Sequence, residues 1–379
     1  MQVTEALRCR IYRTISDCAC AKAEENIVLI ERTTGRREFL KSCLAGAVSF
    51  TVESGSYSLE AARGDRQPTK SKVSIAHDPL LRGAPPERPG QARDLRSSLT
   101  VDEGRVANLL DRAMQGLHDS ADPTRCWAKV VRPGQTVGVK VNTLGGRGLC
   151  SNVQLVDAIC ERLQGAGIRA QDIVIWDRDS TELERAGFRI RTGGNQVRCF
   201  GTDRVGFEEE LVSFGSVGSR LSKILTQRCD VLINVPVLKD HDGAGVSIAL
   251  KNMYGVIHNP NKYHPNGCDP FVADVNMLPE IRAKLHLHIC DATAACFEGG
   301  PAFKPEFMWQ PNALIVAQDP VALDHTGWHM IERKRAEQGL RTLAAEERAP
   351  HYIETAADAE HRLGTNDPRR IVLVETNAA

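Results

Sequence analysis

The side chains best suited to chemistry in this sequence are Lys239 and His241, which follow the apolar run 231–235. Lysine presents a compact positive charge that binds carboxylate or phosphate, and histidine can act as a general acid or base near neutral pH. Neither is a preferred helix cap, so capping explains them poorly. The glycine-rich segment 243–245 follows, and we expect it to begin a helix whose free N–H groups favour an anion. A small anionic ligand is therefore predicted here.

Polar residues also stand at the ends of other predicted strands. In an open parallel sheet, ligands bind beyond the carboxyl ends of the strands. Each such Asp or Asn taken alone is better explained as a cap or turn former. Asp319, which precedes Pro320, is expected to be a helix cap, and Asp324 lies one turn further along. The remaining residues of this kind are Asn142, Asp177 and Asp291, joined by Lys251 and Asn252 near the end of a helix predicted over 244–254.

A divalent metal site is a second hypothesis for the same region. His258 and His264 lie in a Pro-, Asn- and Gly-rich segment with Cys268, Asp269 and Asp274. Together with His241 and Asp291, the two histidines offer suitable ligand types, but the spacings fit no fixed pattern. A solvated loop without metal is the simpler explanation.

The cysteines do not indicate an iron–sulfur cluster of the ferredoxin type. Beyond residue 62, no two of them form a C-x-x-C motif, and such a cluster needs closely spaced thiolates. We expect them to be small buried apolar residues rather than a disulfide framework.

The strands and helices that position these residues are predicted from alternating strand and helix patterns. They predict an α/β fold with a mainly parallel, doubly wound sheet that carries helices on both faces. Several predicted strands are almost continuously apolar, which is typical of strands buried on both sides. Strands are predicted at 136–141, 172–176, 231–235, 285–290, 313–317 and 370–374, and helices at 100–118, 153–165, near Leu183, and at 219–227, 244–254, 270–284 and 321–333.

The N-terminal region has the pattern of a twin-arginine export signal. Arg36-Arg37 precedes Phe39-Leu40-Lys41 and an apolar run at 43–52. That run is too short for a permanent membrane span, which needs roughly twenty residues. An ordinary amphipathic helix with two arginines is the alternative. We predict a leader at 1–62, a linker or loosely packed arm at 63–99 and an α/β domain at 100–379. The predicted partner is the twin-arginine translocase, and the predicted location is periplasmic or otherwise extracytoplasmic.

Composition and motifs exclude several functions. Lys plus Arg and Asp plus Glu number 48 each, which argues against a nucleic-acid surface because phosphate binding needs a basic excess. G-x-S-x-G, P-loop and G-x-G-x-x-G motifs are absent from the sequence, so serine hydrolase, P-loop and dinucleotide-binding functions lose their main support.

The order of short motifs over about 130–330 resembles the family called domain of unknown function 362. These motifs are VGVKVN, IVIWDRDS, CDVLINVPVLKDH, ALKNMYG, CDAT, EGGP and AQDPVALD. Some members of that family carry a ferredoxin-like cysteine module, which this sequence lacks. The resemblance implies an α/β fold and a shared site around Lys140, Asn142, Asp177, Lys239, His241, Lys251, Asn252, Asp291 and Asp324.

Three functions remain open at this point. In the first, an exported enzyme binds a small anionic substrate through Lys239 and Lys251, with His241 as general acid or base, while Asp177 and Asp291 orient a metal or water. In the second, a non-catalytic carrier or accessory protein holds a metal or redox cofactor loaded before export. In the third, a structural protein uses its polar strand ends only as caps.

Overall fold

The computed structural model of the chain describes residues 70–82 and 100–377. The twin-arginine pair, Arg36 and Arg37, and the apolar run after it lie outside the described residues. None of the described helices is long and apolar enough to cross a membrane.

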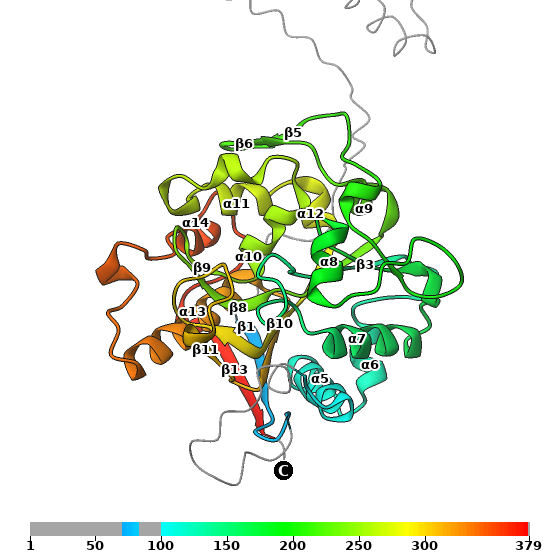
Figure 1. Cartoon of the computed structure of the whole chain (residues 1–379), viewed down its shortest axis with the longest axis horizontal. Helices are drawn as coiled ribbons and strands as arrows, with labels where there is room; N and C mark the ends of the chain where they lie inside the picture. Colours follow the sequence, from blue (N-terminus) through cyan, green and yellow to red (C-terminus); the bar gives the residue numbers. More distant parts are fainter. Residues whose placement is uncertain (1–69, 83–99, 378–379) are drawn as a thin grey trace, which may run out of the picture. The chain divides into compact units, whose positions relative to one another are not determined.

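The centre of the fold is a mixed, mainly parallel sheet (Figure 1). Strands β10, β7, β2, β3 and β4 are parallel to one another, β12 is antiparallel to both of its neighbours, and β13 is parallel to β1. The order across the sheet is β13 (Ile371–Asn377), β1 (Ser71–His77), β12 (Ala313–Ala317), β10 (Leu285–Cys296), β7 (Val231–Asn234), β2 (Val137–Lys140), β3 (Ile173–Trp176) and β4 (Arg198–Cys199).

Helices cover both faces of the sheet because its central strands are apolar on both sides. In β3, Val174 and Trp176 face one core while Ile173 and Ile175 face the other. The first core is covered by α9 (Lys223–Arg228), α10 (Ala249–Asn252), α11 (Phe271–Asn276), α12 (Pro279–Lys284), α13 (Pro320–Glu337) and α14 (Tyr352–Ala357). The second is covered by α5 (Glu103–His118), α6 (Pro123–Ala128), α7 (Val153–Gly165) and α8 (Ser180–Ala186). The predicted doubly wound α/β fold is confirmed.

The structure differs from the predicted helix over 244–254. There the chain forms a hairpin of β8 (Val237–His241) and β9 (Gly245–Ser247), and α10 occupies only the four residues from Ala249. Gly245 has a φ of 75°, and a Cβ on it would collide with the backbone of Arg348. The glycines therefore serve a tight chain reversal rather than a helix start. The predicted anion-binding helix terminus at 243–245 is wrong.

Two shorter predictions also need correction. The helix predicted over 270–284 is split at Pro279 into α11 and α12. The helix predicted over 219–227 begins only at Lys223, because Val217–Ser219 form strand β6, which pairs with β5 (Val212–Phe214).

The segment predicted as a linker or loosely packed arm contains β1, which lies inside the sheet between β12 and β13. Further along, the helix predicted over 100–118 begins at Glu103, because the side chain of Asp102 caps α5 by accepting a hydrogen bond from the backbone N–H of Arg105. β10 runs on past its predicted end and pairs with the short strand β11 (Met308–Trp309). Eight cysteines fall in the described part of the chain; all are free thiols, and seven are buried.

Candidate functional site

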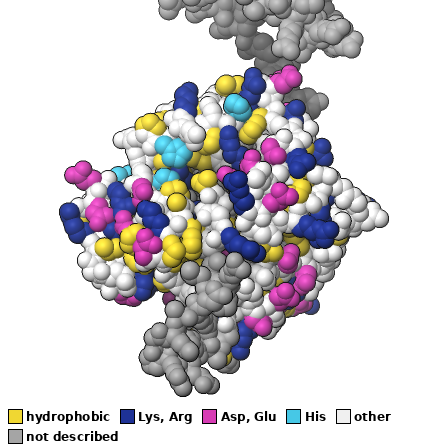
Figure 2. Space-filling model, viewed as in Figure 1, with side chains coloured by type: hydrophobic (Ala, Val, Ile, Leu, Met, Phe, Trp, Pro, Cys, Tyr) yellow, Lys and Arg dark blue, Asp and Glu magenta, His cyan; other side chains and the backbone are white. Residues whose placement is uncertain are grey.

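A pocket of about 300 Å³ opens at the carboxyl ends of β2 and β3. This is the edge of a parallel sheet at which ligands bind. Lys and Arg side chains lie in the middle of the face shown in Figure 2, in the region between α8 and α10, with acidic side chains among them. Seven of the residues predicted from the sequence line the pocket: Lys140, Asn142, Asp177, His241, Lys251, Asn252 and His264.

Lys140 and Asp177 form a buried ion pair on the wall of this pocket. Lys140 Nζ lies 2.8 Å from Asp177 Oδ1, and the two side chains are 1% and 8% exposed. The other oxygen of Asp177 accepts hydrogen bonds from the backbone N–H and the hydroxyl of Thr143, each at 2.8 Å. Gly255 lies against the pair, with a position for a Cβ only 2.7 Å from Lys140 Nζ. The charge of Lys140 is therefore balanced within the protein.

Lys239 does not line the pocket itself but is held behind the lining residue Asn142 by amide groups. Side chains alternate along strand β8, so Lys239 and His241 lie on one face while Asp240 lies on the other. Lys239 Nζ donates to Asn142 Oδ1 at 2.8 Å, and Asn142 Nδ2 donates to Asn252 Oδ1 at 2.9 Å. The Lys239 side chain is 1% exposed, and burial lowers its pKa to about 8. Its hydrogen-bond partner carries no negative charge.

Lys251, which lines the pocket, is a second buried lysine without a carboxylate partner. Its Nζ lies 4.3 Å from the centre of the Tyr254 ring and 3.3 Å from Nε2 of His264. Burial lowers the pKa of Lys251. Within the described residues, no carboxylate lies at ion-pair distance from Nζ of Lys251 or Lys239. The pocket therefore contains uncompensated positive charge.

His241 is a neutral hydrogen-bond donor in this environment. Its Nδ1 accepts hydrogen bonds from the backbone N–H groups of Gly243 and Ala244 at 3.1 and 3.2 Å. The proton of the neutral ring must then be on Nε2. Burial, followed by the charge of Lys251, lowers the His241 pKa to about 2. The general acid or base near neutral pH that the sequence predicts does not fit these surroundings. A metal on Nε2 would need the proton on Nδ1, where both backbone donors oppose it.

Four predicted site residues are not among those that line the pocket: Lys239, His258, Asp291 and Asp324. Asp291 accepts backbone hydrogen bonds from Asn152, the N-cap of α7, and from Thr293. Asp324 accepts them from the first two residues of α10 at 2.7 and 3.2 Å. His258 is exposed, and its ring contacts Phe207. The structure therefore does not gather His241, His258, His264 and Asp291 into the predicted metal site. Asp319 caps α13 as expected.

Several lining residues were not predicted, and Arg178 is the most prominent. Its guanidinium donates to the carbonyl oxygens of Ile257 and His258, both at 2.7 Å. It thereby ties the end of β3 to the loop that carries His264. Its position directly after Asp177, at a predicted strand end, was the available signal. Glu182, Ser247 and Tyr254 also line the pocket.

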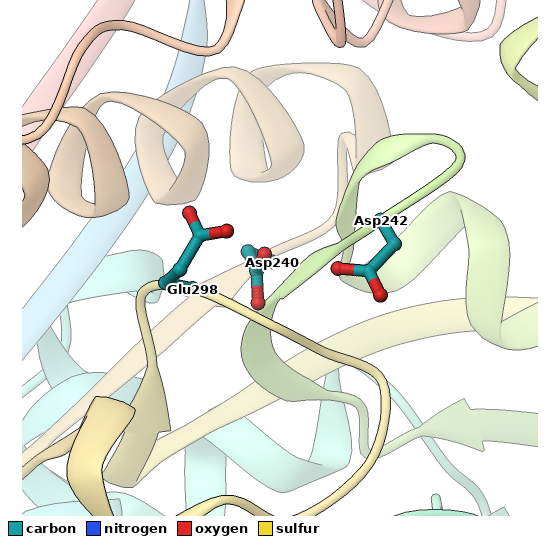
Figure 3. Close-up of side chains that lie close together, drawn as sticks. All are labelled: Asp240, Asp242 and Glu298. Carbon is teal, nitrogen blue, oxygen red and sulfur yellow. The ribbon is translucent and has the colours of Figure 1, made fainter. Parts of the chain in front are cut away.

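An acidic cluster lies on the other side of β8. Figure 3 shows Asp240 between Glu298 and Asp242. In the described part of the chain, this is the only group of three or more His, Cys, Asp or Glu side chains whose ligand atoms lie close enough together to hold one metal ion. They have the right chemistry for a cation, but Arg348 already binds them, at 3.3 Å from Asp240 and 2.8 Å from Glu298. Arg335 forms a further ion pair with Glu298. The cluster is therefore an ion-pair network, and burial raises the Asp240 pKa to about 6.

Fold and pocket together define an α/β protein with a doubly wound sheet and a basic pocket at its carboxyl edge. The chain belongs to the family described as domain of unknown function (DUF362), whose model matches residues 137–329. This confirms the family resemblance seen in the sequence motifs.

Comparison with solved structures finds the crystal structure of a protein from Thermotoga maritima. The two chains are 8% identical and superpose with a TM-score of 0.37, over 62% of this chain and 59% of the other. The match thus spans less than two thirds of the length of that protein. No curated protein matches the chain.

Proposed function

We propose that the pocket binds a small anionic molecule through Lys239, Lys251 and the Nε2–H group of His241. The observation that carries this proposal is the pair of buried ammonium groups without a carboxylate partner. A buried charge is costly unless an opposite charge or a full set of hydrogen bonds compensates it. A bound carboxylate or phosphate would provide both.

The groups around the two lysines suit an anion better than a cation. Lys140, the last residue of β2, neutralises Asp177. The neutral His241 ring offers an N–H donor, and the amide nitrogen of Asn142 is already used in holding Asn252. A volume of about 300 Å³ falls at the lower end of small-molecule sites. The ligand is therefore expected to be a compact phosphate or carboxylate compound.

Calorimetric titration with inorganic phosphate and with citrate tests this proposal. Lys251→Met removes the charge but keeps a long side chain, and we expect it to weaken binding at least tenfold. Lys262→Met is a matched control, because Lys262 lies in the same loop region, is exposed and does not line the pocket. Absence of saturable binding by the wild type, or equal binding by both variants, would contradict the proposal.

We also propose that the twin-arginine translocase exports the chain. The support is the sequence Arg36-Arg37 followed by Phe39-Leu40-Lys41 and a short apolar run. The test is fractionation of cells that express the full chain and its Arg36→Lys/Arg37→Lys variant. Periplasmic wild type with cytoplasmic variant is expected, and export of both in equal amounts would refute the proposal.

A further inference from the structure

Two histidines, His325 and His329, lie one turn apart on helix α13. Their Nε2 atoms are 3.2 Å apart, and their ring centres are 4.4 Å apart. They line a pocket of about 670 Å³ between α13 and strands β1 and β13. This pocket shares no lining residue with the candidate anion site. The pair thus forms a separate feature of the molecule.

The separation of the two nitrogens suits chelation of one metal ion. Zinc binds imidazole nitrogen at roughly 2.0–2.1 Å and prefers tetrahedral coordination in proteins. With those bond lengths, two nitrogens 3.2 Å apart subtend an angle of roughly 100° at the metal. This is close to a tetrahedral angle. The i, i+4 spacing on one helix is also the spacing that places two histidines on one zinc ion.

The tautomers that metal binding needs are available to both rings. Each ring must present a bare Nε2 and keep its proton on Nδ1. Within the described residues, no hydrogen bond to Nδ1 of His325 or His329 is present. His241 differs, because two backbone N–H groups occupy its Nδ1. The α13 pair can therefore adopt the ligand form that His241 cannot.

A carboxylate that lines the same pocket has one oxygen without a hydrogen-bond partner. Glu332 lines the pocket together with the two histidines. One oxygen of Glu332 accepts hydrogen bonds from Trp328 Nε1 and the backbone N–H of Leu343, both at 3.0 Å. The other oxygen is buried and has no hydrogen-bond partner. Because such a group is costly to leave unpaired, a nearby cation would stabilise it.

We propose that Nε2 of His325 and Nε2 of His329 bind a zinc-class divalent metal ion, with Glu332 supplying negative charge beside it. Water completes the coordination shell. The site is separate from the anion pocket, because the two pockets share no lining residue.

Calorimetric titration of the tag-free full chain with zinc chloride, in a buffer without phosphate, tests this site. We expect one zinc ion per chain, and at least tenfold weaker binding for His329→Ala and for His325→Gln. The matched control is His351→Ala, because His351 is an exposed histidine outside both pockets. Thermal melts without metal establish that each variant is folded.

A second comparison separates this site from the anion pocket. Lys251→Met and His264→Ala should both bind zinc as the wild type does. Zinc binding that is absent in the wild type, or unchanged by His329→Ala and His325→Gln, would overturn the proposal. So would loss of zinc binding in His264→Ala, since that result would place the metal in the anion pocket.

Discussion

Replacing Lys239 by Met removes a buried positive charge while keeping a long, flexible side chain. Lys239 is 1% exposed, and its ammonium group has an amide oxygen, not a carboxylate, as its hydrogen-bond partner. Folding therefore takes this charge out of water without providing an opposite charge. We expect Lys239→Met to be more stable than the wild type at neutral pH, although it loses anion binding.

The magnitude follows from the pKa of Lys239, which burial lowers from 10.5 to about 8. At about 1.4 kcal/mol for each pKa unit, burial of the charged form costs about 3 kcal/mol. The variant also loses the hydrogen bond to Asn142, which offsets about 1 kcal/mol of that gain. The free energy of unfolding should therefore rise by about 2 kcal/mol at pH 7.

The stability difference should depend on pH in a defined direction. The pKa of Lys239 is lower in the folded protein than in the unfolded chain, so between pH 8 and 10.5 the unfolded chain holds more protons. The stability of the wild type therefore rises over this window. The advantage of Lys239→Met is complete below pH 8 and disappears toward pH 10.5.

Urea unfolding followed by the fluorescence of the buried Trp127 and Trp176 measures this difference, in phosphate-free buffer at neutral and at alkaline pH. Lys140→Met is the matched control, because it leaves Asp177 without its partner and should destabilise by about 3–5 kcal/mol. If Lys239→Met unfolds at lower urea than the wild type with an unchanged slope, the charge of Lys239 is balanced within the fold. The anion proposal would then lose its basis.

Three further predictions follow from the same geometry. Phosphate binding should weaken as the pH rises through about 8, where Lys239 loses its proton. Calorimetry across that range would give an affinity that does not change with pH if Lys239 were not involved. Gly255→Ala places a Cβ 2.7 Å from Lys140 Nζ and should lower the free energy of unfolding by about 1–3 kcal/mol through overpacking. The control is Gly165→Ala, which should not destabilise the protein because a Cβ at Gly165 meets open space. Arg348→Met leaves the buried Asp240 unpaired and should cost about 2–4 kcal/mol at pH 7. Because the Asp240 pKa is already raised to about 6, protonation should reduce that cost at pH 5, and equal losses at both pH values would count against this explanation.

The central strands were predictable because burial on both faces leaves a local signal. IVIW in β3 and ALIVA in β12 are fully buried and continuously apolar, and VLIN in β7 is fully buried and apolar up to Asn234. β1 gives a similar local signal, but its place inside the sheet depends on partners at 313–317 and 371–377. Such non-local pairing cannot be read from periodicity. The hairpin of β8 and β9 was missed for a related reason, since its glycines fit either a helix start or a tight turn.

The structure brings predicted site residues together where strand ends determine the position of a side chain. Asn142 and Asp177 follow adjacent parallel strands and therefore meet at the same edge. Asp291 was assigned to the site because it follows a predicted strand, and Asp324 was assigned through the family resemblance, yet each accepts backbone N–H groups at a helix start. An aspartate that caps a distant helix looks the same in sequence as one that faces a ligand, because the helix it caps comes from elsewhere in the chain.

Lys140 and Lys239 both lie on strands of the sheet but differ in their tertiary partners. Lys140 ends a strand beside β3, so the carboxylate that follows β3 neutralises it. Lys239 stands opposite Cys296 of β10, whereas Asp291 of that strand stands opposite Val237 and faces the start of α7. The register of β8 against β10 therefore gives Lys239 a thiol as its neighbour where Lys140 has an acid. Because this register also fixes the buried strands, a small shift of the chain cannot relieve the uncompensated charge of Lys239, and that charge is the basis of the proposed anion site.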